Sequence, residues 1–212
     1  MKIHYGVDSF PKLSNAVITT GTFDGVHLGH KKILNKLITL GQKNQTETVL
    51  LTFSPHPRIF LFPENELKLI NTAEENIELF RSYGVDHVIF QNFNKSFSRT
   101  SSLEYIRDVL LKKIGLKDMV IGYNHHFGRN RQGSIENLHE LAELYNFNIH
   151  SVGPCLLRDK SISSTKIRDS IIKGNMELAN SYLGYKFTLT GLVVKGKGMG
   201  RVIGFPTANV SI

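Results

Sequence analysis

The feature that most constrains this chain is an alternation of short apolar runs with amphipathic segments over residues 1–183. Apolar runs of strand length occupy residues 16–20, 48–53, 86–90, 118–122 and 148–152. Helical patterns occupy the segment from Ile33 to Ile38, residues 73–83, 103–114 and 135–145, and two short segments at 167–172 and 176–182. Buried strands joined by helical crossovers form a mostly parallel sheet with helices on both faces. We therefore predict a doubly wound α/β domain, in which ligands bind beyond the carboxyl ends of the strands.

Residues 184–212 have a different pattern and form a second predicted unit. Their apolar residues alternate with period two, glycine recurs, and no helical stretch is visible. This pattern is typical of the opening hairpins of a small β-barrel. Because even a small barrel needs about five strands, we expect only the incomplete N-terminal part of such a domain. We place the domain boundary between residues 183 and 184.

Composition narrows the classes of function. With 41% hydrophobic and 21% charged residues, the 212-residue chain falls in the ordinary globular range and is long enough for an enzyme. No export signal and no apolar run near the roughly 18 residues of a membrane span is visible, so we expect no membrane anchor. The single cysteine, Cys155, excludes an internal disulfide, which favours a cytoplasmic protein. The net charge of +8 favours anionic partners, and because the basic residues are dispersed we do not expect nucleic acid.

The segment G-T-F-D-G-V-H-L-G-H at residues 21–30 directly follows the first apolar run. A strand, a glycine-rich turn and a helix start form an anion site, because free backbone N–H groups and the helix dipole face the turn. The glycines that let the backbone approach a phosphate closely are Gly21, Gly25 and Gly29. We expect His27 and His30 to lie on either side of one phosphate and stabilise its transition-state charge, as neutral donors or as imidazolium. The alternatives are two ordinary surface histidines or a metal site, and a zinc site would need a third ligand at recognisable spacing.

Two further motifs place candidate ligand contacts after later strands. T-F-S-P-H-P, residues 52–57, follows the second apolar run, and its prolines stiffen the chain while His56 is a candidate for a place near a nucleotide. G-Y-N-H-H-F-G-R-N-R-Q-G, residues 122–133, follows the fourth run. There Asn124 can make directional hydrogen bonds to a ligand, or it can cap a turn.

The motif I-S-S-T-K-I-R, residues 162–168, opens a late helix. Its hydroxyls stand at the helix N-terminus, where Ser163 or Ser164 can cap the helix. Because Lys166 and Arg168 follow at once, hydroxyls, free N–H groups and two cations together suit a triphosphate. The segment is therefore either a simple cap or a clamp for the phosphates of a nucleotide.

These motifs together resemble one family. H-L-G-H at 27–30 is similar to the signature of the nucleotidyltransferase superfamily, and the extended form at 21–30 resembles the flavin adenylyltransferase half of bacterial bifunctional riboflavin kinase/FAD synthetases. The motifs at 52–57, 122–133 and 162–168 agree with that family in order and spacing. G-R-V-I-G-F-P-T-A-N at 200–209 resembles the riboflavin kinase signature. The resemblance extends from about residue 16 to residue 212.

The resemblance implies a Rossmann-like nucleotidyltransferase fold and FAD synthesis, in which AMP passes from ATP to FMN and pyrophosphate is released. The catalytic residues that it implies are His27, His30, Asn124 and Arg168. The implied contacts with ATP and FMN are Gly21, Phe23, Gly29, Ser163, Ser164 and Thr165. It also implies Mg²⁺ as cofactor, and Thr207 and Asn209 as the residues that hold Mg²⁺ and ATP for a riboflavin kinase.

Three other functions are weighed against this expectation. The kinase half of the family also uses a carboxylate downstream of F-P-T-A-N, so we do not expect riboflavin phosphorylation from residues 184–212 alone. Related enzymes transfer cytidylyl groups, or adenylyl groups to pantetheine phosphate, but F-P-T-A-N ties this chain to flavin. A non-catalytic flavin- or nucleotide-binding remnant or regulator is the last alternative, and intact His27, His30 and Thr165 argue against it.

Overall fold

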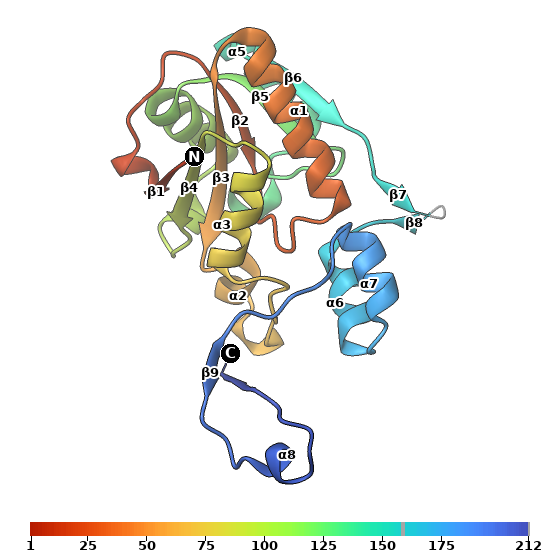
Figure 1. Ribbon diagram of the computed structural model, residues 1–212. Coiled ribbons are helices and arrows are strands. Elements are labelled where there is room, and N and C mark those ends of the chain that lie inside the picture. The colour runs from red at the N-terminus through yellow and green to blue at the C-terminus, as the bar shows by residue number, and fades with distance from the viewer. Residues whose placement is uncertain (158–159, 212) are drawn as a thin grey trace.

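A six-stranded parallel sheet forms the centre of the fold (Figure 1), for which the computed structural model describes residues 1–157 and 160–211. The strands are β1 (Lys2–Tyr5), β2 (Ala16–Thr20), β3 (Glu47–Ser54), β4 (His87–Asn92), β5 (Leu116–Gly122) and β6 (Asn148–Val152). They lie in the order β1-β4-β3-β2-β5-β6, and every neighbouring pair is parallel. The doubly wound α/β sheet is confirmed, with one edge strand, β1, that the sequence pattern did not reveal.

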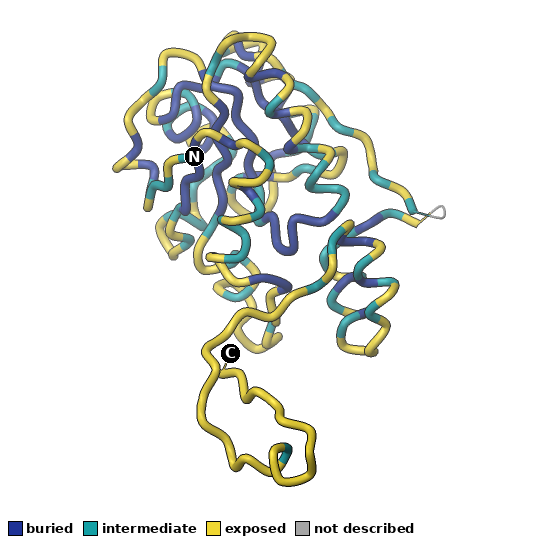
Figure 2. Tube along the Cα trace, viewed as in Figure 1, coloured by how far each residue is buried: buried dark blue, intermediate teal, exposed yellow. Residues whose placement is uncertain are grey.

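Helices cover both faces of the sheet. They are α1 (Leu28–Asn44), α3 (Ala73–Ser82), the π-helix η4 (Tyr105–Ile114) and α5 (Ile135–Tyr145). Because successive side chains of a strand point to opposite faces, Val17 packs in a core cluster with α1 and α3, whereas its neighbour Ile18 packs in a second cluster with η4 and α5. Figure 2 shows the buried chain concentrated in these layers. The apolar runs of the sequence are therefore strands, and those of β2, β3, β4 and β5 are covered on both sides as predicted, whereas the residues of the edge strand β6 are only half-buried or exposed.

Shorter elements join these layers. They are η1 (Val7–Ser9), α2 (Pro57–Leu61), η2 (Pro63–Asn65), η3 (Phe97–Arg99), α4 (Ser102–Glu104) and η5 (Arg129–Arg131). Helix α3 begins at a capping box of Thr72 and Glu75 and ends before Gly84, where the sequence predicted its end. The helix expected over residues 103–114 is also present, but beyond the single turn of α4 its hydrogen bonds are of the π type.

A helix pair stands beside the carboxyl ends of the strands. It consists of α6 (Ser164–Ile172) and α7 (Met176–Leu183), and the short antiparallel strands β7 (Leu156–Leu157) and β8 (Lys160–Ser161) precede it. The pair has its own small core, in which Ile167 and Leu183 are fully buried and pack with Ile70. Both short helices that the sequence predicted are confirmed.

The last segment, residues 188–211, lies apart from the sheet and is largely exposed (Figure 2). It contains the antiparallel strands β9 (Leu192–Val194) and β10 (Asn209–Ser211), and between them the one-turn helix α8 (Met199–Val202). The expectation of no helical stretch after residue 184 is therefore wrong at α8, where four residues form a single helical turn. Within residues 1–157 and 160–211, none of the helices is both long enough and apolar enough to cross a membrane.

Candidate functional site

Three of the sequence motifs meet at one edge of the sheet. From β2 the chain moves through β3 to β4, and then returns to place β5 on the other side of β2. This reversal between β2 and β5 is the topological switch point, where open α/β sheets bind ligands. The turn at 21–27 follows β2, the proline segment at 55–57 follows β3, and the loop from Tyr123 follows β5. Parallel pairing places these three segments side by side.

His27 caps its own helix. Its Nδ1 accepts the backbone N–H groups of Gly29 at 3.1 Å and His30 at 3.3 Å, as the N-cap of α1. Since Nδ1 is the acceptor, the neutral ring carries its proton on Nε2. Burial lowers the pKa of His27 to about 4, so the ring is neutral at physiological pH. His27 can therefore act as a fixed Nε2–H donor, and not as an imidazolium.

His30 stacks directly on His27. The ring centroids are 3.7 Å apart with an interplanar angle of 15°. Burial, followed by the proximity of His27, lowers the pKa of His30 well below its usual value. Its Nδ1 is buried without a hydrogen-bond partner in the described part of the chain. The expectation that the two rings lie on either side of one phosphate is wrong in that form, because stacked faces leave no room between them and only the ring edges can meet a ligand.

Phe23 and two glycines form the support of this pair. The Phe23 ring is buried, tilted against His30 at a centroid distance of 5.1 Å and edge-on to Phe80 at 6.0 Å. A Cβ added to Gly29 would lie 3.0 Å from Cε1 of His27, and one added to Gly21 would lie 3.2 Å from the Phe23 ring. Both glycines thus permit the close packing of the histidine pair, whereas the Phe23 side chain belongs to the core beneath it.

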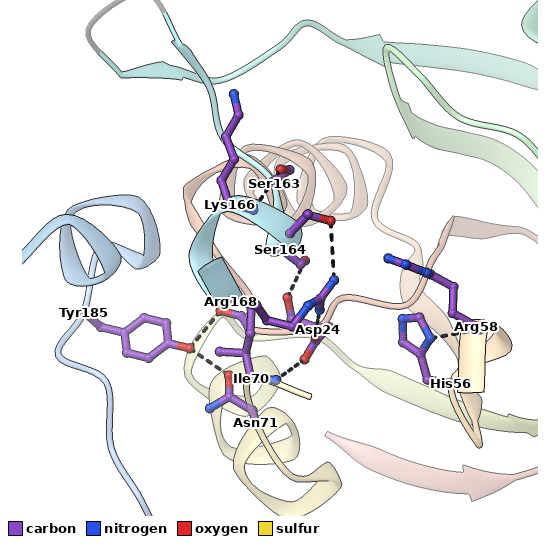
Figure 3. A network of polar contacts seen from close by, with 12 residues as sticks. Asp24, His56, Arg58, Ile70, Asn71, Ser163, Ser164, Lys166, Arg168 and Tyr185 are labelled. Atoms are coloured by element: carbon purple, nitrogen blue, oxygen red, sulfur yellow. Dashed lines mark hydrogen bonds and ion pairs between the residues drawn. The ribbon is translucent and has the colours of Figure 1, made fainter. Parts of the chain in front are cut away.

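Asp24 joins the turn to two distant segments (Figure 3). Its side chain is only 4% exposed, accepts the N–H of Ile70 at 2.8 Å and pairs with the Arg168 guanidinium. Burial raises the pKa of Asp24, and the hydrogen bond from Ile70 and the charge of Arg168 oppose that rise only in part. The backbone oxygen of Asp24 also accepts the hydroxyl of Ser164 at 2.9 Å. This aspartate is not among the residues predicted from the sequence, although a lone acid in the predicted phosphate-binding turn was a signal that it needs a cation.

Helix α6 brings the predicted hydroxyl clamp to the same place. Ser163 is its N-cap and accepts the N–H of Lys166 at 3.4 Å. Thr165 is exposed, and its hydroxyl lies 3.5 Å from Nη2 of Arg168. The ammonium group of Lys166 turns away to the carbonyl of Ser161, at 2.7 Å. The structure therefore brings Ser164 and Arg168 to the turn at Asp24 and directs Lys166 elsewhere.

The other two motifs contribute histidines with lowered pKa values. His56 caps α2 through its Nδ1, and burial together with the nearby charges of Arg168 and Arg58 lowers its pKa to about 4. In Figure 3, His56 lies to the right of the Asp24–Arg168 pair, on the side away from Tyr185. Asn124 is exposed just beyond β5. Burial lowers the pKa of His125 to about 4, and its ring stacks on Phe127 at a centroid distance of 5.9 Å.

Thr207 and Asn209 are not part of this assembly. Both are exposed in the last segment, where Asn209 pairs with Val194 in the β9–β10 ladder. Among residues 1–157 and 160–211 there is no group of three or more histidine, cysteine or acidic side chains placed to hold a metal ion. The predicted residues thus separate into one cluster at the switch point of the sheet and one pair on the last hairpin.

Comparisons with known proteins match two family descriptions to two parts of the chain. The sequence pattern of the family described as FAD synthetase matches residues 9–166, and that of riboflavin kinase matches residues 183–212. A protein of Buchnera aphidicola (subsp. Schizaphis graminum) named bifunctional riboflavin kinase/FMN adenylyltransferase is 38% identical over all of this chain and 69% of its own length. The protein of the same name from Escherichia coli K12 is 32% identical, over 100% of this chain and 68% of its own. A crystal structure titled macrolide-efflux protein from Streptococcus pneumoniae has a TM-score of 0.89 and 27% identity, over 99% of this chain and 68% of that one.

Proposed function

The chain belongs to the FAD synthetase family and makes FAD by transferring AMP from ATP to FMN, and we propose that the cluster at the switch point between β2 and β5 carries out this transfer. The observation that supports the assignment is a convergence around Asp24. The phosphate-binding turn with His27, and the clamp helix with Ser164 and Arg168, meet there although about 140 residues separate them. The two histidines and the cationic start of α6 lie on adjacent segments, so they can bind neighbouring phosphate groups of one polyphosphate.

The histidines have no proton to remove in this reaction. The FMN phosphate is largely a dianion at neutral pH, because the second pKa of a phosphate monoester is about 6. It can attack the α-phosphorus of ATP in line without a general base. The neutral Nε2–H of His27 and the edge of the His30 ring then stabilise the charge that develops on the α-phosphate, as hydrogen-bond donors fixed in advance. Positioning and charge stabilisation together account for catalysis in this scheme.

The start of α6 receives the leaving pyrophosphate in this proposal. The N–H groups of Ser164 and Thr165 lie in the first helical turn and have no carbonyl partner within the helix. The hydroxyl of Thr165 is exposed beside Arg168. Arg168 gives one guanidinium nitrogen to Asp24 and retains other N–H donors for phosphate oxygens. The helix dipole adds to this attraction for an anion.

In this proposal the flavin binds beyond the carboxyl ends of β3, β4 and β5. Four phenylalanines from the end of β3, from α2, and from the segment that leads from β4 into η3 form a cluster with centroid separations of 5.7 to 6.0 Å: Phe53, Phe60, Phe93 and Phe97. Phe60 is 38% exposed, so this cluster offers an aromatic surface for an isoalloxazine ring. Asn124, exposed after β5, orients the ligand through its amide.

Magnesium would bind together with ATP. In the described part of the cluster, Asp24 is already committed to Arg168 and Ile70, so the ion is held mainly by ATP phosphates and water, as Mg²⁺ prefers. When bound, it neutralises phosphate charge. On the last hairpin, the side-chain oxygens of Thr207 and Asn209 suit Mg²⁺ and ATP in a riboflavin kinase reaction. We also propose a cytoplasmic location, where ATP is supplied.

The test is FAD formation from ATP and FMN, followed by liquid chromatography, with riboflavin replacing FMN in a parallel reaction. We expect FAD from FMN; product from riboflavin would add kinase activity to the chain. His27→Ala and His30→Ala should each lower kcat roughly 10²- to 10³-fold, as the loss of a transition-state donor does, with much smaller changes in the KM for ATP. His139→Ala, an exposed histidine on α5, is the matched control. Unchanged turnover in both active-site variants would refute the assignment.

A further inference from the structure

A tyrosine outside the nucleotidyltransferase motifs reaches the phosphate-binding turn. The Tyr185 hydroxyl lies 2.7 Å from the backbone oxygen of Gly25 and 2.9 Å from Oδ1 of Asn71 (Figure 3). Tyr185 falls in the segment that matches riboflavin kinase, residues 183–212, and not in the FAD synthetase match at 9–166. A side chain outside the FAD synthetase match therefore contacts the backbone two residues before His27.

The turn that Tyr185 contacts is held in an unfavourable backbone conformation. Phe23 has a φ of 48°, Gly25 of 80° and Val26 of 33°, all in the left-handed region. For the bulky Phe23 and the β-branched Val26 this conformation costs free energy, and it persists only where surrounding contacts over-determine it. His27 follows directly, so the placement of both histidine rings depends on those contacts.

The contacts come from two sides. On one side, Asp24 accepts the N–H of Ile70 and its backbone oxygen accepts the Ser164 hydroxyl. On the other side, Tyr185 joins Gly25 to Asn71, the residue next to Ile70. The contacts of Ile70 and Tyr185 thus link the turn to the segment 70–71, and the Ser164 hydroxyl links it to α6. The hydroxyl of Tyr185 makes the contact nearest to His27.

The backbone next to Tyr185 is also fitted to the start of α1. Gly184 has a φ of 71°, and a Cβ added to it would lie 2.4 Å from Cδ2 of Leu28. The ammonium group of Lys31 donates to the Gly184 oxygen at 3.0 Å and lies 5.5 Å from the centre of the Tyr185 ring. Burial raises the pKa of Tyr185, so its hydroxyl remains a proton donor over the whole working pH range. The ring is therefore fixed, and its single hydroxyl proton is shared between the Gly25 carbonyl of the turn and the Oδ1 of Asn71.

We propose that Tyr185 is a positioning residue for adenylyl transfer, which holds the Gly25 carbonyl so that His27 and His30 face the α-phosphate. The inference rests on the proposed role of the two histidines. Tyr185 itself touches neither ATP nor FMN in this scheme. Loss of its hydroxyl should slow the chemical step and leave substrate binding nearly unchanged, because a small displacement of catalytic groups costs rate more than affinity.

The test is Tyr185→Phe in the full chain, which removes the hydroxyl and keeps the ring beneath the Lys31 ammonium group. We expect kcat for FAD formation to fall about five- to tenfold, with KM for ATP and for FMN within twofold of wild type. Tyr83→Phe is the matched control, because Tyr83 also lies beneath Lys31, at 5.9 Å, and contacts no residue of the turn through a hydrogen bond in the described chain. Its kcat should equal that of wild type.

A second measurement separates positioning from general stabilisation. If Tyr185 acts through the two histidines, its substitution should lower kcat by less than twofold in a His27→Ala/His30→Ala background, so that the effects are not additive. Full additivity, an unchanged kcat in Tyr185→Phe, or a loss confined to KM would each overturn the inference. Absence of FAD from the wild-type enzyme would instead contradict the proposed function, so the two failures can be told apart.

Discussion

Arg168→Gln provides a quantitative test of the network around Asp24. The arginine side chain is 12% exposed and the Asp24 side chain 4%, so the substitution leaves a buried carboxylate without its cation. Removing one partner of such a pair costs about 3–5 kcal/mol, since the remaining charge stays desolvated. With a urea m-value of about 2 kcal/mol/M, the unfolding midpoint should fall by about 1.5–2.5 M.

The pKa of Asp24 gives the sign of a second effect. Burial already raises this pKa, and loss of Arg168 removes a charge that opposes the rise. A carboxyl whose folded pKa lies above its unfolded value contributes stability at low pH and loses that contribution as the pH rises through the folded pKa. The double variant Asp24→Asn/Arg168→Gln removes the charge but keeps an oxygen for the Ile70 N–H. It should be more stable than Arg168→Gln at pH 7.5, and the gap should narrow at pH 5.5.

Urea denaturation followed by circular dichroism at both pH values measures these differences. The histidines titrate in both variants, so their effects cancel in the comparison. Arg81→Gln, which breaks the exposed pair with Glu78, should cost less than about 1 kcal/mol and controls for loss of an arginine. A loss below about 1 kcal/mol for Arg168→Gln, or a double variant no more stable than the single one, would refute the account of a buried, dependent pair.

Two further predictions concern the stability of the fold in acid and the glycine that ends helix η4. Because the pKa values of His27 and His125 lie near 4 in the folded protein, the unfolded chain binds more protons between pH 6.5 and 4, and the free energy of unfolding should fall over that range by on the order of 3 kcal/mol per histidine. Urea titrations should show a weaker fall in His125→Gln, and an equal fall would contradict the assignment. Gly115→Ala should destabilise the fold far more than Gly84→Ala: both have positive φ, but only at Gly115 would the new Cβ meet a backbone oxygen, that of Leu13, at 2.0 Å. Equal unfolding midpoints would show that steric space at Gly115 does not matter.

Local signals in the sequence were sufficient for most of the α/β architecture. Apolar runs such as 118–122 predict buried strands because both faces of those strands are covered, and Gly84 and Gly115 mark helix ends because a left-handed residue stops a helix. The anion site predicted at 21–30 also rests on local features, because its N–H groups belong to the turn and the helix start, and it stays a prediction. The edge strand β1 was not predicted because the alternation of polar and apolar residues in it covers only four residues, and its pairing with β4 is a long-range contact.

The contacts that shape the site depend on the tertiary structure alone. Arg168 reaches Asp24 across 144 residues of sequence, and Tyr185 reaches Gly25 across 160. No local pattern specifies such partners, because they depend on which segments the strand order brings to the same edge of the sheet. The spacing of His27 and His30 was visible in the sequence, but the orientation and protonation of their rings were not. The helix cap made by Nδ1 of His27 and the stacking of the two rings fix both rings as neutral groups with only their edges open. The sequence alone thus predicts that the polar motifs follow the strands. Only the long-range packing determines which of their side-chain atoms are left without a protein partner and can bind a ligand.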